Sequence, residues 1–176
     1  MKNKSLKKNL TFKTVKNKNL AKNILLDICK LKMQKWKSNL LSQQKWFKKN
    51  IKNDDLHNCL YFGKKLIGYT CLRRRKFKYL LNSANYLLFD TLIIKKNMRG
   101  FNHGSRLMKY NNKIIRKNKL PSFLLTTKKI KNFYLKNQWK KIDNKFKFLN
   151  HKKNKKLLMS YNFKKIKNNY SLVFKA

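Results

Sequence analysis

Between positions 88 and 108 the chain reads Leu88-Phe-Asp-Thr-Leu-Ile-Ile-Lys-Lys-Asn-Met-Arg-Gly-Phe-Asn-His-Gly-Ser-Arg-Leu-Met108. The apolar run from Tyr86 to Ile94 predicts a buried strand, and a short polar loop with two glycines follows it. Helical spacing then begins, with one face formed by Leu107, Met108, Asn111, Ile114 and Ile115. The pattern predicts a strand, a tight turn and the start of a helix.

This turn is a candidate phosphate-binding site. The first turn of a helix leaves backbone N–H groups unpaired and carries the positive end of the helix dipole. Glycine in the preceding loop lets an anion approach the backbone closely. The competing interpretation is an ordinary polar loop in front of a helix.

The segment Arg99-Gly-Phe-Asn-His-Gly104 resembles the acyl-CoA loop of the GCN5-related N-acetyltransferase superfamily, whose pattern is Gln/Arg-x-x-Gly-x-Gly/Ala. Asn102 stands where the first motif glycine is expected, and Asn tolerates a positive φ better than most other residues. The resemblance implies that the pyrophosphate of acetyl-CoA is held by Arg99, Gly100, Phe101, Asn102, His103, Gly104 and Ser105. It also implies that the backbone of Leu92, Ile93 and Ile94 contacts pantetheine and the thioester carbonyl, where an N–H would stabilise the oxyanion.

A second resemblance lies downstream, at Phe133-Tyr-Leu-Lys-Asn-Gln-Trp139. The family signature is Phe-Tyr-x-Lys-x-Gly-Phe/Trp, and here Gln138 replaces the glycine. In the family the tyrosine equivalent to Tyr134 returns a proton to the departing CoA thiolate, a role that suits a phenol protonated at neutral pH. The alternative is that Tyr134 is a core aromatic residue.

The general base is where the sequence departs most from the family. Many relatives have a Glu in the fourth or fifth strand, whereas this chain contains no Glu and its stretch Ser122–Thr127 has no carboxylate. Asp90 is the one acid in the central region, and it either assists deprotonation of the amine or serves a structural purpose. Water alone is a third possibility, because the amine has only one proton to lose.

The composition is strongly basic, with 48 Lys and Arg against 5 Asp and a net charge of +43. Such a charge favours polyanions, nucleic acid included. However, only six of the basic residues are Arg, the residue that dedicated nucleic-acid surfaces prefer. We therefore interpret the charge mainly as compositional background, and nucleic acid is possible as a partner but not favoured.

The order of predicted elements is strand, helix, helix, three strands, helix, strand, helix and two closing strands. The helices are expected at 20–36, from Ser42 to about residue 53, after 104 and around 130–134; a hairpin is expected around Gly63, and a last strand near 172–174. The segment 73–78 is expected to be a basic loop or a solvated strand end. By resemblance the fold is α+β, of the acyl-CoA N-acyltransferase type, with a mixed, mostly antiparallel central sheet flanked by helices. Residues 1–9 are expected to be frayed and 10–176 to form a single domain.

Other features of the sequence bear on metal binding, cysteine chemistry and cellular location. Three widely spaced cysteines indicate reduced, mostly buried thiols, and the three histidines show no metal-ligand spacing, so no metal is expected. The sequence has no apolar run of transmembrane length and no signal peptide, which predicts a cytoplasmic protein.

The resemblance implies an enzyme that transfers an acetyl group from acetyl-CoA to a primary amine by direct attack. The sequence does not decide whether the acceptor is a small amine, an amino sugar or a protein amine. The alternative is a basic RNA- or ribosome-associated binding protein on a decayed acetyltransferase scaffold, because a fold outlasts its function.

Overall fold

The computed structural model describes residues 9–149, 156–164 and 171–175. The expectation of fraying at 1–9 therefore falls almost entirely outside the described residues. The helices are α2 (Lys22–Met33), α3 (Leu40–Asn50), α4 (His103–Lys117) and α5 (Lys131–Lys136), with 3₁₀ turns at Asn17–Asn19, Lys96–Met98 and Lys128–Ile130. The strands are β1 (Leu10–Lys16), β2 (Leu56–Phe62), β3 (Lys65–Tyr79), β4 (Asn82–Ile94), β5 (Ser122–Thr126), β6 (Lys140–Lys141), β7 (Phe146–Leu149), β8 (Leu157–Tyr161) and β9 (Leu172–Lys175).

The chain divides into two compact units. The first contains Met1–Arg73 and Asp90–Asn111, and the second contains Arg74–Phe89 and Asn112–Ala176. The long elements β3, β4 and α4 each contribute residues to both units. The expectation of one domain over 10–176 stays a prediction.

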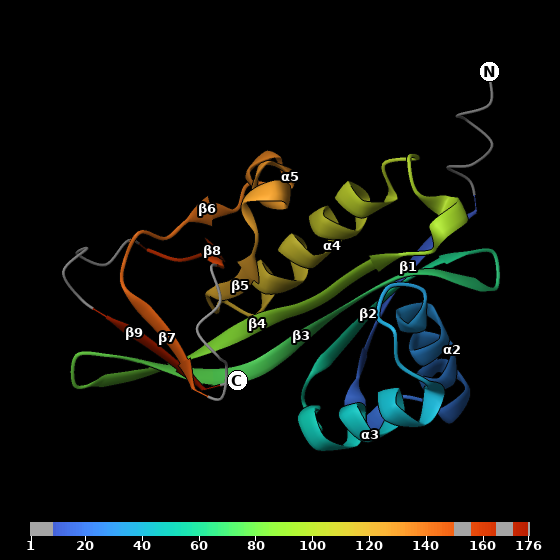
Figure 1. Cartoon of the computed structure of the whole chain (residues 1–176), viewed down its shortest axis with the longest axis horizontal. Coiled ribbons are helices and arrows are strands. Elements are labelled where there is room, and N and C mark those ends of the chain that lie inside the picture. The colour runs from blue at the N-terminus through green and yellow to red at the C-terminus, as the bar shows by residue number, and fades with distance from the viewer. Residues whose placement is uncertain (1–8, 150–155, 165–170, 176) are drawn as a thin grey trace. The chain divides into compact units, whose positions relative to one another are not determined.

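In the first unit, β1, β2, β3 and β4 are hydrogen-bonded in that order. The helices α2 and α3 cover one face of these strands, and the beginning of α4 covers the other (Figure 1). Alternation along β2 produces this arrangement, because Cys59 faces α2 and α3 whereas Leu60 packs with Leu107 of α4. The predicted hairpin is confirmed, and Gly63 occupies its turn with φ +56°.

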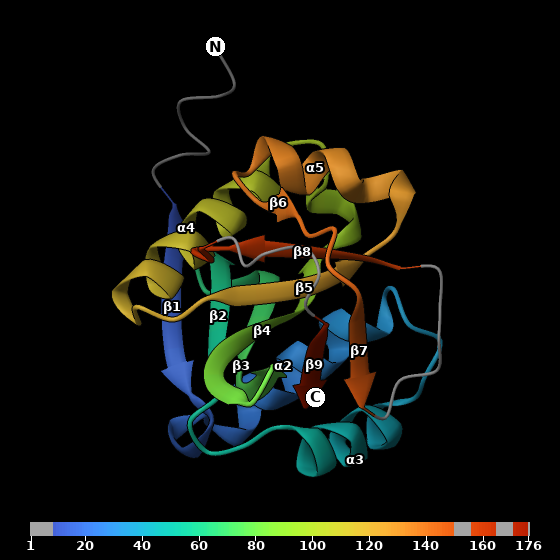
Figure 2. The same ribbon diagram turned by 90° about the vertical axis from the view of Figure 1, so that its left-hand side faces the viewer.

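In the second unit, β5 lies parallel to β4 and antiparallel to β8, and β9 lies between β3 and β7 (Figure 2). Its core is aromatic: the rings of Phe77, Tyr86, Phe123 and Phe174 contact one another, and Phe148 stacks on Phe174. Five of the seven strand pairings with a printed register are antiparallel. The predicted mixed, mostly antiparallel sheet is confirmed.

One local prediction was wrong, and a second was correct only in part. Asn39 caps α3, since its side chain accepts a hydrogen bond of 2.8 Å from the backbone N–H of Ser42, so the helix begins before Ser42 rather than at it. The segment 73–78 forms the last part of the 15-residue strand β3, so the strand-end alternative is confirmed and the loop is not, but the segment is only partly solvated, because Arg73 and Arg75 are buried and Arg74 is exposed. Strand alternation places every second residue inward whatever its charge, so a basic run does not mark a loop.

Candidate acyl-CoA site

Near its end the strand β4 contains one residue with a left-handed backbone conformation, Thr91. This residue has a φ of +56°, which is a rare conformation for a β-branched side chain and costs about 1–3 kcal/mol. The Thr91 hydroxyl donates a hydrogen bond of 3.3 Å to Oδ1 of Asp90. Backbone strain inside an otherwise regular strand is typical of functional sites, because the surrounding fold must hold it in place.

The residues after Thr91 behave as the sequence predicted for side chains of the core. Ile93 packs on the side of α2 and α3, whereas Ile94 packs with Leu107 of α4, and both are buried. Leu92 is half-buried. The distorted backbone at Thr91 comes directly before the three residues that the family resemblance assigns to the thioester.

The loop between β4 and α4 makes the tight turn that the sequence predicted. Gly100 has a φ of +87° and Asn102 has a φ of +59°, so Asn102 does adopt the left-handed conformation expected of a motif glycine. The helix begins at His103, and the Asn102 carbonyl accepts a hydrogen bond of 3.1 Å from the N–H of Arg106. The N–H groups of His103, Gly104 and Ser105 therefore belong to the first turn of α4, where no intrahelical acceptor exists.

Two side chains of this loop differ in their environment. Arg99 folds back on the strand, because its Nε donates a hydrogen bond of 3.0 Å to the carbonyl of Ile94. Phe101 is half-exposed, at 50%. Arg99 thus fixes the start of the loop, and Phe101 offers an aromatic face beside it.

His103 is buried at the first position of α4, with 2% of its surface exposed. Among the described residues neither ring nitrogen has a hydrogen-bond partner. Burial, and secondarily the neighbouring Arg106, lowers the pKa of this imidazole. This buried polar ring without a partner lies beside the N–H groups of the first turn of α4.

Tyr134 belongs to the second unit, on the short helix α5. It is 7% exposed and packs edge-on against Phe89 and Trp139, with ring centroids 6.5 and 6.4 Å away. Burial raises the pKa of the phenol to about 12. Its carbonyl accepts hydrogen bonds from the N–H groups of Asn137 and Trp139, and between them Gln138 has a φ of +70°, at the position of the family glycine.

No family model matches the chain, and no curated protein matches it by sequence. Solved structures do match. ElaA of Escherichia coli is 13% identical, with a TM-score of 0.63 over 86% of this chain and 98% of that one. An acyl-CoA N-acyltransferase of Pseudomonas aeruginosa is 12% identical with the same TM-score and coverage. The PaiA N-acetyltransferase of Thermoplasma acidophilum, solved with coenzyme A, is 16% identical, with a TM-score of 0.55 over 87% of this chain and 99% of that one.

The chain has the fold of the GCN5-related N-acetyltransferases. The predicted fold class is thereby confirmed. Two positions of the acetyltransferase motifs that lack glycine, Asn102 and Gln138, both adopt the positive φ that glycine would supply.

In this acetyltransferase fold Asp90 is engaged in an ion pair. Its Oδ2 lies 3.1 Å from Nη1 of Arg73, and the Asp90 side chain is 27% exposed against 7% for Arg73. Arg73 also donates a hydrogen bond of 3.0 Å to the carbonyl of Asn50, at the end of α3. The contacts give Asp90 a structural role, and its residual exposure leaves one edge of the carboxylate open.

That edge faces a pocket that the sequence did not reveal. The pocket has a volume of about 390 Å³ and belongs entirely to the first unit. Asp90 and Thr91 of β4 line it together with Lys32, Trp36, Ser38, Gln43 and Trp46 from α2, α3 and the turn between them. The residues that line the pocket come from two segments more than 40 positions apart in the sequence, so local patterns could not bring them together. The tryptophans at 36 and 46 were the one feature of the sequence that could have suggested a pocket here.

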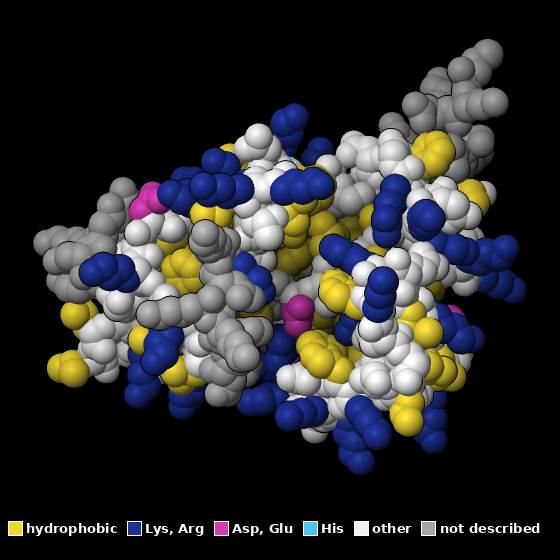
Figure 3. All heavy atoms as spheres, viewed as in Figure 1, with side chains coloured by type: hydrophobic (Ala, Val, Ile, Leu, Met, Phe, Trp, Pro, Cys, Tyr) yellow, Lys and Arg dark blue, Asp and Glu magenta, His cyan; other side chains and the backbone are white. Residues whose placement is uncertain are grey.

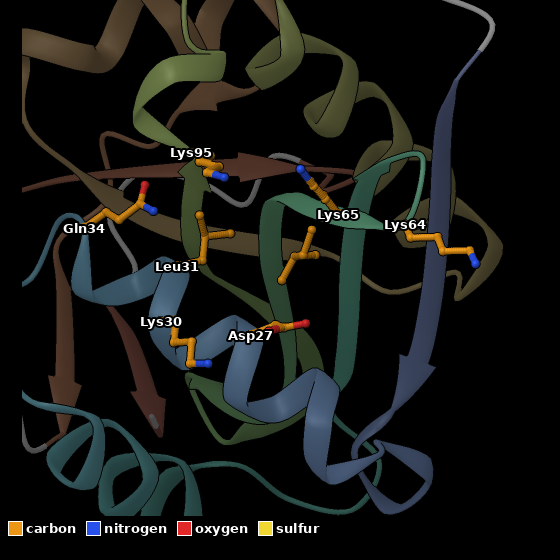
Figure 4. A pocket seen from close by; sticks show the side chains of 8 residues that line it. Asp27, Lys30, Leu31, Gln34, Lys64, Lys65 and Lys95 are labelled. Carbon is orange, nitrogen blue, oxygen red and sulfur yellow. The ribbon is translucent and has the colours of Figure 1, made fainter.

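A second pocket of the first unit is lined by lysines, on the side of α2 away from α3 (Figure 4). Its volume is about 280 Å³, and its charged residues are Asp27, Lys30, Lys64, Lys65 and Lys95. These lysines are solvent-exposed or half-exposed and resemble those on the rest of the surface. Figure 3 shows Lys and Arg side chains spread over the visible face rather than gathered in one patch, which agrees with charge as compositional background.

Further sequence expectations can be compared with the structure. All three cysteines are free and buried, as expected. Within the described residues no group of three potential metal ligands occurs, and no helix reaches the length and apolarity needed to cross a bilayer.

Proposed function

We propose that the protein is an N-acyltransferase that transfers the acetyl group of acetyl-CoA to a primary amine. The single observation that carries the proposal is the turn from Gly100 to Asn102, whose two positive φ values lead directly into the N-terminus of α4. In the acetyltransferase fold this turn aims the free N–H groups of one helix end at a diphosphate. The buried, unpaired ring of His103 supports the proposal.

The reaction is a direct attack of the amine on the thioester carbon. The backbone after Thr91 is the proposed oxyanion-binding element, because the left-handed conformation of Thr91 changes the direction of the backbone beside it. The nitrogen loses its proton to solvent water, the C–S bond breaks, and Tyr134 donates its phenolic proton to the thiolate and is then reprotonated from solvent. A phenol with a pKa of about 12 remains protonated at neutral pH and is able to serve as that acid.

Thermal melting with and without acetyl-CoA tests the proposal, since a ligand that binds only the native state raises the melting midpoint. We expect the wild-type midpoint to rise and the Gly104→Glu midpoint to stay unchanged. A carboxylate in the first turn of a helix is favourable for folding but repels a phosphate, so this variant is expected to fold.

Lys109→Glu is the matched control, because Lys109 is exposed on the same helix beyond its first turn and its replacement changes the net charge more than Gly104→Glu does. It should keep the acetyl-CoA shift. If acetyl-CoA does not move the wild-type midpoint, or moves the Gly104→Glu midpoint equally, the proposed site is wrong. Binding to RNA with a steep salt dependence in place of acetyl-CoA binding would favour the scaffold alternative.

A further inference from the structure

Lys32 is a buried lysine in the pocket beside Asp90. It lies on α2 with 5% of its surface exposed. Its Nζ is 3.8 Å from the ring centroid of Trp46, 4.7 Å from that of Phe47 and 6.0 Å from that of Trp36. Three aromatic faces thus surround the ammonium group, an arrangement that stabilises a cation only in part.

The ammonium group of Lys32 lacks a counter-ion. Within the described residues Lys32 has no ion pair, and the pocket's one carboxylate, Asp90, is held by Arg73 at 3.1 Å. Burial lowers the pKa of Lys32, and the charge of Asp90 is the main influence that opposes this shift. A buried cation that is not neutralised is unfavourable, so an anion that enters the pocket gains more here than at a surface lysine.

The pocket places this cation at the same cavity as Asp90 and Thr91 of β4. Its volume of about 390 Å³ suits a small molecule rather than a folded partner. Ser38 and Gln43 add polar groups on the α2 and α3 side. A molecule in this pocket can contact the buried cation Lys32 at one end and the strained backbone at Thr91 at the other.

We propose that Lys32 is a specificity-determining residue that selects a small acceptor carrying an anionic group, a carboxylate or a phosphate, in addition to its amine. This inference rests on the proposed function, because the pocket is taken as the acceptor site. Polyamines and uncharged amino sugars lack the anion and are poor acceptors.

Matched acceptor pairs test the inference by thiol release from acetyl-CoA. Phosphoethanolamine is compared with ethanolamine, and L-methionine with L-methioninamide, so that the two arms separate phosphate from carboxylate. We expect kcat/KM for the anionic member of at least one pair to be about 10- to 100-fold higher. Lys32→Met should bring that ratio close to one, Lys32→Arg should retain most of it, and Lys30→Met, an exposed change on the same helix, should leave it intact.

Tryptophan fluorescence gives a readout that does not depend on acyl transfer, because Trp36 and Trp46 line the pocket. Phosphoethanolamine should change the wild-type emission at lower concentration than ethanolamine, and this difference should vanish in Lys32→Met. No preference in wild type, or a preference that survives in Lys32→Met, would overturn the inference, as would mass-spectrometric detection of an acetyl group on Lys32 itself. If every amine is inactive and acetyl-CoA fails to bind, the proposed function fails, and the fluorescence comparison alone then decides the role of Lys32.

Discussion

The Arg73 guanidinium on β3 lies 3.1 Å from the Asp90 carboxylate on β4, and it also donates a hydrogen bond to the carbonyl of Asn50. One arginine therefore joins the end of α3 to the part of β4 where Thr91 adopts its strained conformation. Asp90 lines the proposed acceptor pocket, and its ion pair with Arg73 holds this part of β4 in position.

Removal of the carboxylate should leave the buried Arg73 without its ion-pair partner. We expect Asp90→Ala to reduce the free energy of unfolding by about 3 kcal/mol, as for other partly buried ion pairs that lose one partner. Urea denaturation measures the effect. Asp54→Ala is the control, because Asp54 pairs with Lys16 at the surface and its loss should change stability by less than about 1 kcal/mol. Equal effects of the two variants would contradict the structural role of the Arg73–Asp90 pair.

Because Gln138 adopts a left-handed conformation, glycine should be tolerated better than alanine at this position. A side chain at a φ of +70° is strained by about 1 kcal/mol, which glycine avoids. Gln138→Gly should therefore be more stable than Gln138→Ala by about 1 kcal/mol, since both remove the same side-chain contacts but only glycine relieves the strain. Thermal or urea unfolding of the two variants makes the comparison, and a more stable alanine variant would show that the turn is not maintained in solution.

The buried His57 predicts a loss of stability in acid. Its Nδ1 lies 2.8 Å from the hydroxyl of Tyr69, its Nε2 lies 3.1 Å from Oδ1 of Asn17, and burial lowers its pKa to about 4. The folded state thus binds the proton less tightly than the unfolded state, whose pKa is about 6.5. The stabilisation by neutral His57 is complete above pH 6.5 and is lost as the pH falls towards 4, by about 3 kcal/mol in total.

Urea unfolding at several pH values between 7 and 4 measures this loss. His57→Gln should show a shallower decline than wild type over the same interval, because an amide does not titrate. The carboxylates titrate in both proteins, so the difference between the two curves isolates His57. Parallel curves would mean that His57 is not the group responsible.

If Tyr134 is the catalytic acid, replacing it should slow acyl transfer without weakening the binding of acetyl-CoA. Tyr134→Phe should lower kcat by roughly 10²- to 10⁴-fold, the usual contribution of a positioned acid, while acetyl-CoA still raises the melting midpoint. Tyr79→Phe is the matched control, because it removes a hydroxyl from a half-buried tyrosine of the same unit. Full thiol release by Tyr134→Phe would remove the catalytic assignment and leave the fold unaffected.

Local sequence patterns were sufficient for most of the secondary structure and for the turn before α4. The strand from Tyr86 to Ile94, the helical face that includes Leu107, and the hairpin at Gly63 follow from apolar periodicity and glycine placement, which act over a few residues. The substitution of Asn102 for glycine was also interpretable, because its effect lies in the φ of one residue. The sequence could not show that Thr91 leaves the strand conformation, since Thr is among the residues most typical of strands.

From the sequence by itself, periodicity determined where most helices and strands lie, and the resemblance of Arg99–Gly104 and Phe133–Trp139 to family motifs implied the fold class and the proposed acyl-CoA loop, because both kinds of signal are contained in short stretches of chain. The tertiary structure alone decided which polar groups are buried together. Lys32 and Asp90 are 58 positions apart in a chain with 48 basic residues, and no pattern distinguishes a buried lysine from a solvated one. Burial and pairing depend on which strands and helices meet, and the chemistry of the pocket arises from that long-range packing.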